Sequence, residues 1–486
     1  MLFIEPFWLC ILIPIVVAPI SLGASLAFHH WRLPRIDKAI VLSAAGLALA
    51  SIGGGALFAV VLVALVLFTH RVGLVIESAG KEPESARGGL PRARTWLAVA
   101  VGVQSATVAA MSRAGIIDGP LRGIRGVLVP FGLSYFAFHG ISYLVDVYRR
   151  RAIADRSRWQ LAVHLILLPQ IAGGPLTYES VARQVARRLP SLSDYSYGVR
   201  RLIIGAWKVF VMAALAGAQA DATFGVRRAT LNASQAWLGI VCFTMQMYYA
   251  FSGYSDMGIG FGRMLGIRLP ENFRWPYVAG SVREFWRRWH IGLSAWFGEY
   301  ADLSPAPDRV PPLTTAREAL VVGLCAVWYG VGWTFVVWGL YHASLIVLER
   351  RGLETALKRL PAPLRSVYLL TVVIVGWTVL RSATLGDALA FQKALAGLNP
   401  SASQVRVTVD PELWLLLVAG AVGCAPLLPS IRRWTVAIDA LIVSILMMGF
   451  ASVLFTWRCG RMVVMPVVQW WRGTPTRVGP QGGNAL

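Results

Sequence analysis

Long apolar runs separated by short basic connections make up most of this 486-residue chain. A helix needs roughly 20 apolar residues to cross the hydrocarbon core of a bilayer. The pattern predicts helices over Phe7–Phe28, Ala39–Phe68, Thr95–Met111, Val127–Val147, Leu161–Ile171, Leu202–Ala220, Ala236–Phe251, Ala319–Val331, Thr334–Val347, Val367–Leu380, Leu413–Leu427 and Val436–Phe455. Several are too short to cross alone, which favours re-entrant helices buried in protein. We expect an all-α polytopic membrane protein with roughly ten to twelve transmembrane or re-entrant helices.

Composition and charge support a membrane protein. The chain is 56% hydrophobic and 14% charged, whereas a soluble domain carries roughly 25% charged residues. Its formal net charge is +22, and the basic residues gather in connections such as 149–158 and 183–201. Basic loops are typical of the cytoplasmic side of a membrane. The arginines are spread over many loops, which argues against nucleic acid, while anionic lipid or a phosphate-bearing donor stays open.

Polar residues interrupt the apolar pattern most strongly between Tyr248 and Tyr300. An ionisable side chain at the centre of a bilayer costs about 2.5–3.5 kcal/mol on insertion scales, so such residues usually mark a site or a pathway. Asp256 lies in the glycine-rich stretch Tyr254–Gly262, where glycines allow helices to approach closely. We expect an arginine partner for Asp256. Two interpretations stay open, a structural ion pair and the polar wall of a substrate tunnel.

The segment Val282–Trp296 predicts one continuous helix. At helical spacing Phe285, Trp289 and Leu293 share a face. Tryptophans interleaved with arginines suit an anchoring helix in the headgroup zone, and spacing alone favours this interpretation. The alternative makes His290 a general base near arginines that contact phosphate. Glu284 and Arg288 are also spaced for an ion pair within the helix.

Two further segments interrupt the apolar pattern. Val327–His342 predicts a tight helical hairpin, in which Tyr329 and His342 are the groups suited to handling protons. Leu168–Pro175 contains Pro and Gly, and predicts either a broken helix that lines a cavity or a simple loop. The five cysteines show no metal-ligand spacing, so we expect buried thiols and no metal site.

The ordered motifs resemble the membrane-bound O-acyltransferase family, in particular its bacterial branch of alginate O-acetylation and teichoic acid D-alanyl transfer. The likeness covers roughly 128–350 and rests on four segments. They are PFGLSYFAFHGISYLVDVYRR, LLPQIAGGP, YYAFSGYSDMGIGFGRMLGIRLPENF and EFWRRWHIGLSAWF. The resemblance implies a ring of helices around a central tunnel, a thioester donor on the cytoplasmic side and an acceptor hydroxyl on the other side.

The resemblance also implies site residues, with one departure. The family's catalytic histidine belongs to a Trp-His-Gly step, which here is Trp328-Tyr329-Gly330, whereas the second histidine is retained as His290. The candidate catalytic residues are His290, Tyr329 and His342. The candidate donor-binding or tunnel-lining residues are Arg283, Arg287, Arg288, Trp286, Trp289, Asp256, Asn272 and Trp328. Three outcomes stay open: another histidine replaces the base, Tyr329 donates a hydrogen bond to the thioester carbonyl, or transfer is lost.

We therefore predict one membrane domain in the bacterial inner membrane, crossing it several times. It divides into N-terminal spans (1–126), a core (127–350), C-terminal spans (351–472) and a disordered tail (473–486). The expected activity is transfer of an acetyl or similar acyl group from acetyl-CoA or another thioester to an envelope polysaccharide or a periplasmic acyltransferase. We expect no tightly bound cofactor. The alternatives are a non-catalytic scaffold or conduit and, less favoured, a secondary transporter.

Overall fold

The computed structural model describes residues 59–80, 89–113, 122–166, 191–300, 314–330, 332–399 and 411–425, and single positions 174, 175, 178 and 184. Within these ranges the chain forms helices and no strand, which confirms the all-α prediction for the described part. The predicted spans Phe7–Phe28 and Val436–Phe455, the tail after 472 and most of Leu168–Pro175 lie outside the described residues.

Most of the described helices overlap a predicted apolar run, although Ala59–Gly80 and Ala233–Met264 extend well beyond the predicted ends at Phe68 and Phe251. The described helices are Ala59–Gly80, α3 (Gly89–Arg113), α4 (Arg122–Tyr148), α5 (Arg158–Ile166), α8 (Leu192–Trp207), α9 (Ala214–Phe224), α10 (Ala233–Met264), α11 (Val282–Trp286), α12 (Ile291–Tyr300), α13 (Thr315–Tyr329), α14 (Trp333–Leu348), α15 (Glu354–Lys358), α16 (Ala362–Arg381), α17 (Leu385–Leu395) and α18 (Pro411–Gly423). Two π-helical segments, η1 (Lys208–Ala213) and η4 (Glu349–Leu353), continue α8 and α14. The predicted hairpin over Val327–His342 is confirmed as the end of α13 and the start of α14.

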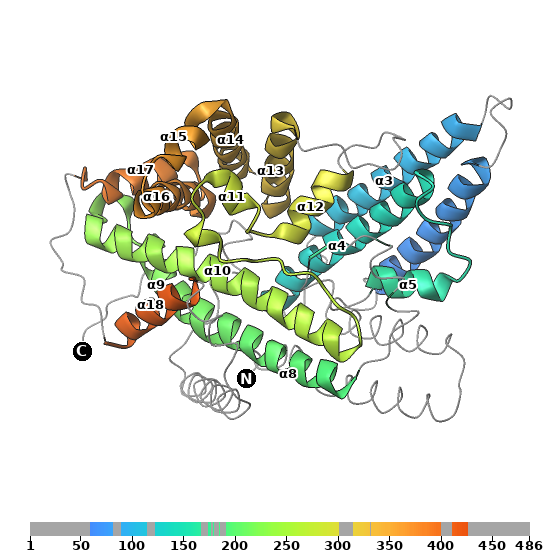
Figure 1. Cartoon of the computed structure of the whole chain (residues 1–486), viewed down its shortest axis with the longest axis horizontal. Coiled ribbons are helices and arrows are strands. Elements are labelled where there is room, and N and C mark those ends of the chain that lie inside the picture. Colours follow the sequence, from blue (N-terminus) through green and yellow to red (C-terminus); the bar gives the residue numbers. More distant parts are fainter. Residues whose placement is uncertain are drawn as a thin grey trace, which may run out of the picture.

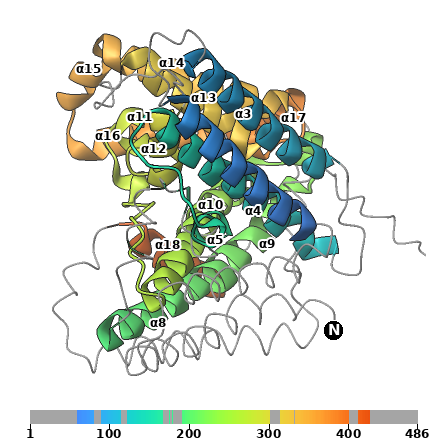
Figure 2. The ribbon, with the colours of Figure 1, turned by 90° about the vertical axis from the view of Figure 1, so that its right-hand side faces the viewer.

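Helix α10 is the central element of the described fold. It begins at a capping box in which the Asn232 side chain accepts from the Gln235 N–H and the Gln235 side chain accepts from the Asn232 N–H. From there α10 runs through the middle of the molecule, between α8 on one side and the α11–α14 region on the other (Figure 1). Helices α3 and α4 lie side by side at one flank (Figure 2).

Glycines bring α8 and α10 into backbone contact. A Cβ atom on Gly198 would lie 2.5 Å from the Gly260 carbonyl oxygen, and one on Gly205 would lie 2.6 Å from the Gly253 oxygen. The same conflict arises from the other side, because a Cβ on Gly253 would lie 2.8 Å from the Gly205 oxygen. Small residues at membrane helix interfaces permit this kind of approach. The close helix contact predicted for the glycine-rich stretch is therefore confirmed.

Three described helices are long and apolar enough to cross a membrane, namely Ala59–Gly80, the continuous stretch Ser193–Phe224 and Ala362–Arg381. Large apolar side chains on the outside of several helices are exposed, including Trp333, Leu415 and Val60. Both features fit a protein surrounded by lipid. The count of ten to twelve spans and the ring around a tunnel stay predictions.

Candidate functional site

The candidate site is built on a break between two short helices. Helix α11 ends at Trp286 and α12 begins at Ile291, so the prediction of one continuous helix over Val282–Trp296 is wrong. His290 stands directly before α12 with a φ of 45°, in the left-handed region that is uncommon for residues other than glycine. Such outliers cluster at functional sites, where surrounding structure holds them in place.

Asn272 holds this break in place. Its backbone carbonyl accepts from the Ile291 N–H at 3.0 Å, and its side-chain oxygen accepts from the Gly292 N–H at 2.9 Å. These N–H groups open α12 and have no partner inside the helix. The Asn272 side-chain nitrogen donates to the Ser255 hydroxyl on α10 at 3.0 Å. Asn272, predicted to line a tunnel, is buried and ties α10 to the turn at His290.

Position 292 accepts only a glycine in this arrangement. A Cβ atom on Gly292 would lie 2.5 Å from the Asn272 side-chain oxygen, which is the oxygen that accepts from the Gly292 N–H. The sequence His290-Ile291-Gly292 therefore provides both the turn and the two N–H groups that bind Asn272. This explains why the break falls there in a segment whose apolar spacing predicts a helix throughout.

His290, Tyr329 and Trp289 form a hydrogen-bonded group. The phenol oxygen of Tyr329 lies 3.3 Å from His290 Nδ1 and accepts a hydrogen bond from the Trp289 indole nitrogen at 3.1 Å. All three side chains are buried, with His290 4% exposed and Tyr329 1% exposed. The structure thus brings together two of the three predicted catalytic residues, although they are 39 residues apart in the sequence.

Aromatic rings enclose the His290 imidazole. Phe273 stacks on it with ring centroids 5.8 Å apart, and Trp328 meets it edge-on at 5.4 Å. Phe251 of α10 lies 5.9 Å away and also contacts Tyr329. Trp328, another predicted lining residue, donates its indole N–H to the Ser134 hydroxyl on α4 at 3.2 Å. Within the described residues, the rings around the His290 imidazole carry no charge, which strengthens a hydrogen bond made there.

His342 lies apart from the His290–Tyr329 pair. Its Nδ1 accepts from the Trp286 indole nitrogen at 3.4 Å. Trp338 packs against both His342, at 5.1 Å between ring centroids, and Tyr329, at 5.6 Å. Trp338 therefore separates the two groups. The third predicted catalytic residue and Trp286 belong to a neighbouring aromatic cluster.

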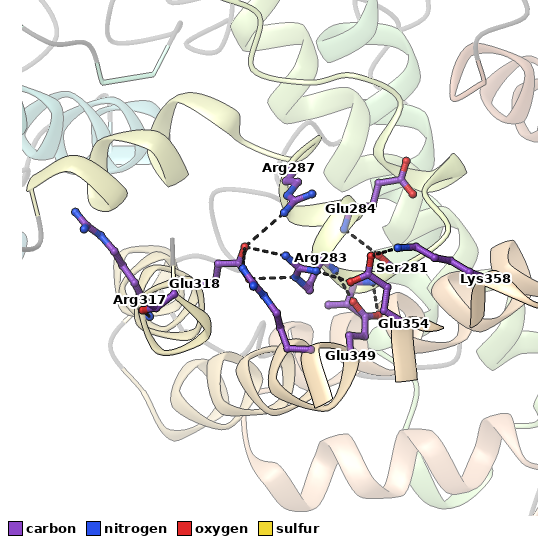
Figure 3. Close-up of polar contacts among 12 residues, drawn as sticks. Ser281, Arg283, Glu284, Arg287, Arg317, Glu318, Glu349, Glu354 and Lys358 are labelled. Carbon is purple, nitrogen blue, oxygen red and sulfur yellow. Dashed lines mark hydrogen bonds and ion pairs between the residues drawn. The ribbon is translucent and has the colours of Figure 1, made fainter. Parts of the chain in front are cut away.

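Of the predicted arginines, Arg283 lies in the first turn of α11, whereas Arg287 and Arg288 directly follow its last residue, Trp286. Arg283 and Arg287 belong to a network of ion pairs (Figure 3). Arg283 is 11% exposed and pairs with Glu318 of α13, at 3.1 Å, and with Glu354 of α15. Arg288 pairs with Glu284, which confirms that predicted pair. Arg287 reaches Glu318 at 3.6 Å and remains 63% exposed. Of the three arginines, Arg287 therefore has the most guanidinium surface left for a ligand.

The pKa values of the two carboxylates that pair with Arg283, Glu318 and Glu354, are both lowered. Burial by itself would raise the pKa of Glu318, but hydrogen bonds from Arg283 and Arg350 outweigh it and hold the pKa below its usual value. The hydrogen bond from Lys358, followed by that from Arg283, lowers the pKa of Glu354. Both carboxylates are therefore charged at neutral pH, which is the state that binds Arg283.

Comparison with known proteins places these residues in a family. Residues 133–374 match the model of the MBOAT, membrane-bound O-acyltransferase family. The chain is 34% identical over 339 residues to the "Probable alginate O-acetylase AlgI" of Azotobacter vinelandii, a match that covers 67% of this chain and 66% of that protein. It is 33% identical to the protein of the same name from Pseudomonas putida, over 66% of this chain and 67% of that one.

The chain belongs to the membrane-bound O-acyltransferase family. The "Peptidoglycan O-acetyltransferase" of Helicobacter pylori is also similar, 30% identical over 56% of this chain and 58% of that protein. The match spans slightly less than two thirds of the A. vinelandii protein. The predicted family membership is thus confirmed, and every predicted site residue lies within 133–374.

Asp256 has a mixed set of charged partners within this family core. Its two carboxylate oxygens accept from Arg201 at 2.5 Å and from Lys208 at 2.6 Å. Arg201 also pairs with Glu271, the residue before Asn272, at 2.6 Å. The expected arginine partner is confirmed, and the contacts favour the structural interpretation. The network ties α8 and η1 to α10 and to the segment that holds His290.

Glu349 is a site residue that the sequence-based prediction missed. It is 1% exposed, and its two oxygens accept from the N–H groups of Val282 at 2.7 Å and Arg283 at 2.9 Å, while Tyr368 donates to it at 3.1 Å. A carboxylate at these positions satisfies the first donors of α11. Its only signal in the sequence is a charge directly after the apolar run that ends at Leu348.

Proposed function

We propose that this chain is an O-acyltransferase with its reaction centre at Trp289, His290 and Tyr329. The observation that carries the proposal is the hydrogen-bonded pair of His290 and Tyr329, which lies within the family match and is held by a left-handed turn. An imidazole within hydrogen-bond reach of a hydroxyl is the arrangement that general-base catalysis requires.

His290 is the proposed base. Acyl transfer to an alcohol requires removal of a proton from the hydroxyl that attacks the acyl carbon, and imidazole performs this task near neutral pH. The enclosing rings of Phe251, Phe273 and Trp328 exclude water and so protect an acyl thioester from hydrolysis. Asn272 and Glu349 act through the backbone, because they fix the two helices that flank His290.

The names of the relatives support acetyl as the acyl group and an envelope polysaccharide as the acceptor. We infer a cytoplasmic thioester donor such as acetyl-CoA, and an acceptor or periplasmic acyltransferase on the opposite side of the inner membrane. The exposed guanidinium of Arg287 is suited to the phosphates of such a donor. The proposal thus assigns Arg287 to donor binding and the buried group of Trp289, His290 and Tyr329 to chemistry.

The test uses the full chain reconstituted in lipid vesicles and supplied with acetyl-CoA carrying a labelled acetyl group. Candidate acceptors are membrane-derived envelope polysaccharides together with periplasmic extract. The proposal expects label in an alkali-labile ester on the acceptor, above the level in protein-free vesicles. Absence of labelled ester with every acceptor fraction and both vesicle orientations would contradict it.

A scaffold or conduit is the second candidate, and Trp328-Tyr329-Gly330 is the observation that favours it. A phenol has a pKa near 10 and is a poor base at neutral pH compared with imidazole. If the chain has lost transfer, Tyr329→His would create activity that the parent lacks. A parent that transfers acetyl without this substitution excludes the scaffold interpretation.

A further inference from the structure

We propose that Tyr329 is the nucleophile of the reaction and carries the acyl group as an aryl ester between donor and acceptor. The inference deepens the proposed O-acyltransferase function and rests on it. It assigns a covalent modification site to the one residue at which the chain departs from the Trp-His-Gly step expected from the resemblance.

The two hydrogen bonds to the Tyr329 oxygen define its state. The Trp289 indole nitrogen can only donate, so the phenol oxygen must accept that bond. In the tautomer of His290 that carries its proton on Nε2, the phenol proton points at His290 Nδ1, 3.3 Å away. A nucleophile beside a base, with a third group that orients them, is the arrangement found in covalent catalysis, and its distances are often long when no substrate is bound.

The Trp289 N–H has a second consequence for the Tyr329 oxygen. As the phenol loses its proton, negative charge develops on this oxygen, and a fixed donor 3.1 Å away stabilises that charge. Asn272 holds the backbone of the turn that presents both Trp289 and His290. The base and the charge-stabilising donor are therefore adjacent residues, placed by the same left-handed turn.

The proposed reaction balances in two steps. First, His290 Nδ1 takes the phenol proton, the Tyr329 oxygen bonds to the thioester carbonyl carbon, the carbon–sulfur bond breaks, and the departing thiolate receives the proton from the imidazolium. Second, His290 takes the proton of the acceptor hydroxyl, whose oxygen bonds to the acyl carbon. The bond to the Tyr329 oxygen breaks, and the phenolate regains the proton. A phenol, with its pKa near 10, leaves more readily than an aliphatic alcohol, so the second step runs toward the acceptor.

Other nucleophiles near the pair fit less well. Ser294 lies one helical turn after His290 on α12, and Cys325 lies one turn before Tyr329 on α13. Within the described part of the chain, neither side chain forms a hydrogen bond with the His290 imidazole, although the Ser294 N–H donates to the His290 carbonyl at 3.1 Å. Both provide matched controls, because Cys325→Ala and Ser294→Ala remove a nucleophile from the same region while keeping the Tyr329–His290 contact.

The experiment looks for the acyl group on the protein itself. The reconstituted chain is mixed with labelled acetyl-CoA in the absence of acceptor, quenched in acid, digested and analysed by mass spectrometry. We expect one acetyl group on the peptide that contains Tyr329, released by hydroxylamine at neutral pH and transferred when acceptor is added. The label should persist in Cys325→Ala and Ser294→Ala, form at least about 100-fold more slowly in His290→Gln and disappear in Tyr329→Phe.

The outcomes separate this inference from the proposed function. Acetyl transfer by the parent with no acetyl on Tyr329 at any time point overturns the nucleophile and leaves the acyltransferase intact. Label at Tyr329 that never reaches an acceptor supports the nucleophile and contradicts the proposed transfer. Neither label nor transfer overturns both. Because the parent peptide is mapped directly, the conclusion does not depend on the folding of Tyr329→Phe. Tyr329→His adds a check, since it should transfer without labelled protein.

Discussion

The two ends of the segment 281–290 have opposite surroundings, although they are less than three helical turns apart. At one end Arg283 is enclosed by the carboxylates of Glu318 and Glu354. At the other end His290 is enclosed by aromatic rings and contacts a neutral phenol. Arg283 at the first end is paired with two carboxylates, whereas in the described part of the chain no charged side chain forms an ion pair or hydrogen bond with His290 or Tyr329.

The difference shows how one short segment both fixes α11 through ion pairs and holds the proposed catalytic residue His290. A paired charge that loses its partner is costly, so the ion pairs of Arg283 with Glu318 and Glu354 link α11 to α13 and α15 and resist displacement. Uncharged aromatic walls instead leave the histidine and phenol to change protonation without competition from a nearby ion. Variants at the first end should therefore affect stability most, and variants at the second end should affect transfer.

The largest effect is expected from removing the Tyr329 hydroxyl. Tyr329→Phe keeps the ring and its packing but removes the atom that contacts His290 and Trp289, so acyl transfer should fall by at least about 100-fold. Tyr341→Phe is the matched control, because its hydroxyl donates to the Val372 carbonyl on α16. Transfer rates measured in vesicles should separate the two variants, and equal rates for Tyr329→Phe and the parent would remove the hydroxyl from the mechanism.

The next effect concerns stability at the charged end. Arg283→Ala removes the buried cation that Glu318 and Glu354 share, although Arg287 and Arg350 still pair with Glu318 and Lys358 still pairs with Glu354. The substitution should lower the free energy of unfolding by about 1–3 kcal/mol. Arg287→Ala removes an exposed guanidinium that pairs with the same carboxylate, Glu318, and should change the free energy of unfolding by about 0.5 kcal/mol or less. Thermal unfolding in one detergent tests the pair. Equal losses of stability would show that burial of Arg283 has no energetic role.

The smallest expected effect is the pH dependence of the stability difference between the parent and Arg283→Ala. The pKa values of Glu318 and Glu354 are lowered in the folded chain, so their contribution is present above the unfolded value of about 4.3 and is lost as pH falls through the folded values. The difference in melting temperature between the parent and Arg283→Ala should therefore be larger at pH 7 than at pH 4. A difference that grows on acidification would contradict the assignment.

Local pattern predicted most of the helices, because the length of an apolar run is a property of neighbouring residues. It also predicted that Asp256 needs a cationic partner, since the cost of an unpaired charge applies wherever the residue lies. It did not identify Arg201 or Lys208, which lie 55 and 48 residues away in the sequence and are brought near by the α8–α10 contact. Such partners follow from the three-dimensional fold.

The break at His290 could not be predicted from local pattern. The spacing of Phe285, Trp289 and Leu293 is helical, and all three are buried, yet the chain leaves the helix between Trp286 and Ile291. The cause is Asn272, which replaces the missing helical hydrogen bonds from outside the segment. Similarly, Glu349, 67 residues after Val282 in the sequence, accepts hydrogen bonds from the backbone N–H groups at the start of α11. Local periodicity carries no information about either partner.

The central claim is that His290 acts as the base, and transfer by His290→Gln tests it most directly. Glutamine retains a polar side chain of similar size but accepts no proton at neutral pH. The rate of labelled acetyl transfer in vesicles, measured beside the parent and His342→Gln, should fall by about 10²–10⁴-fold for His290→Gln. It should remain within about tenfold of the parent for His342→Gln, which Trp338 separates from Tyr329. A His290→Gln protein that is folded and transfers acetyl at the parent rate would contradict the account.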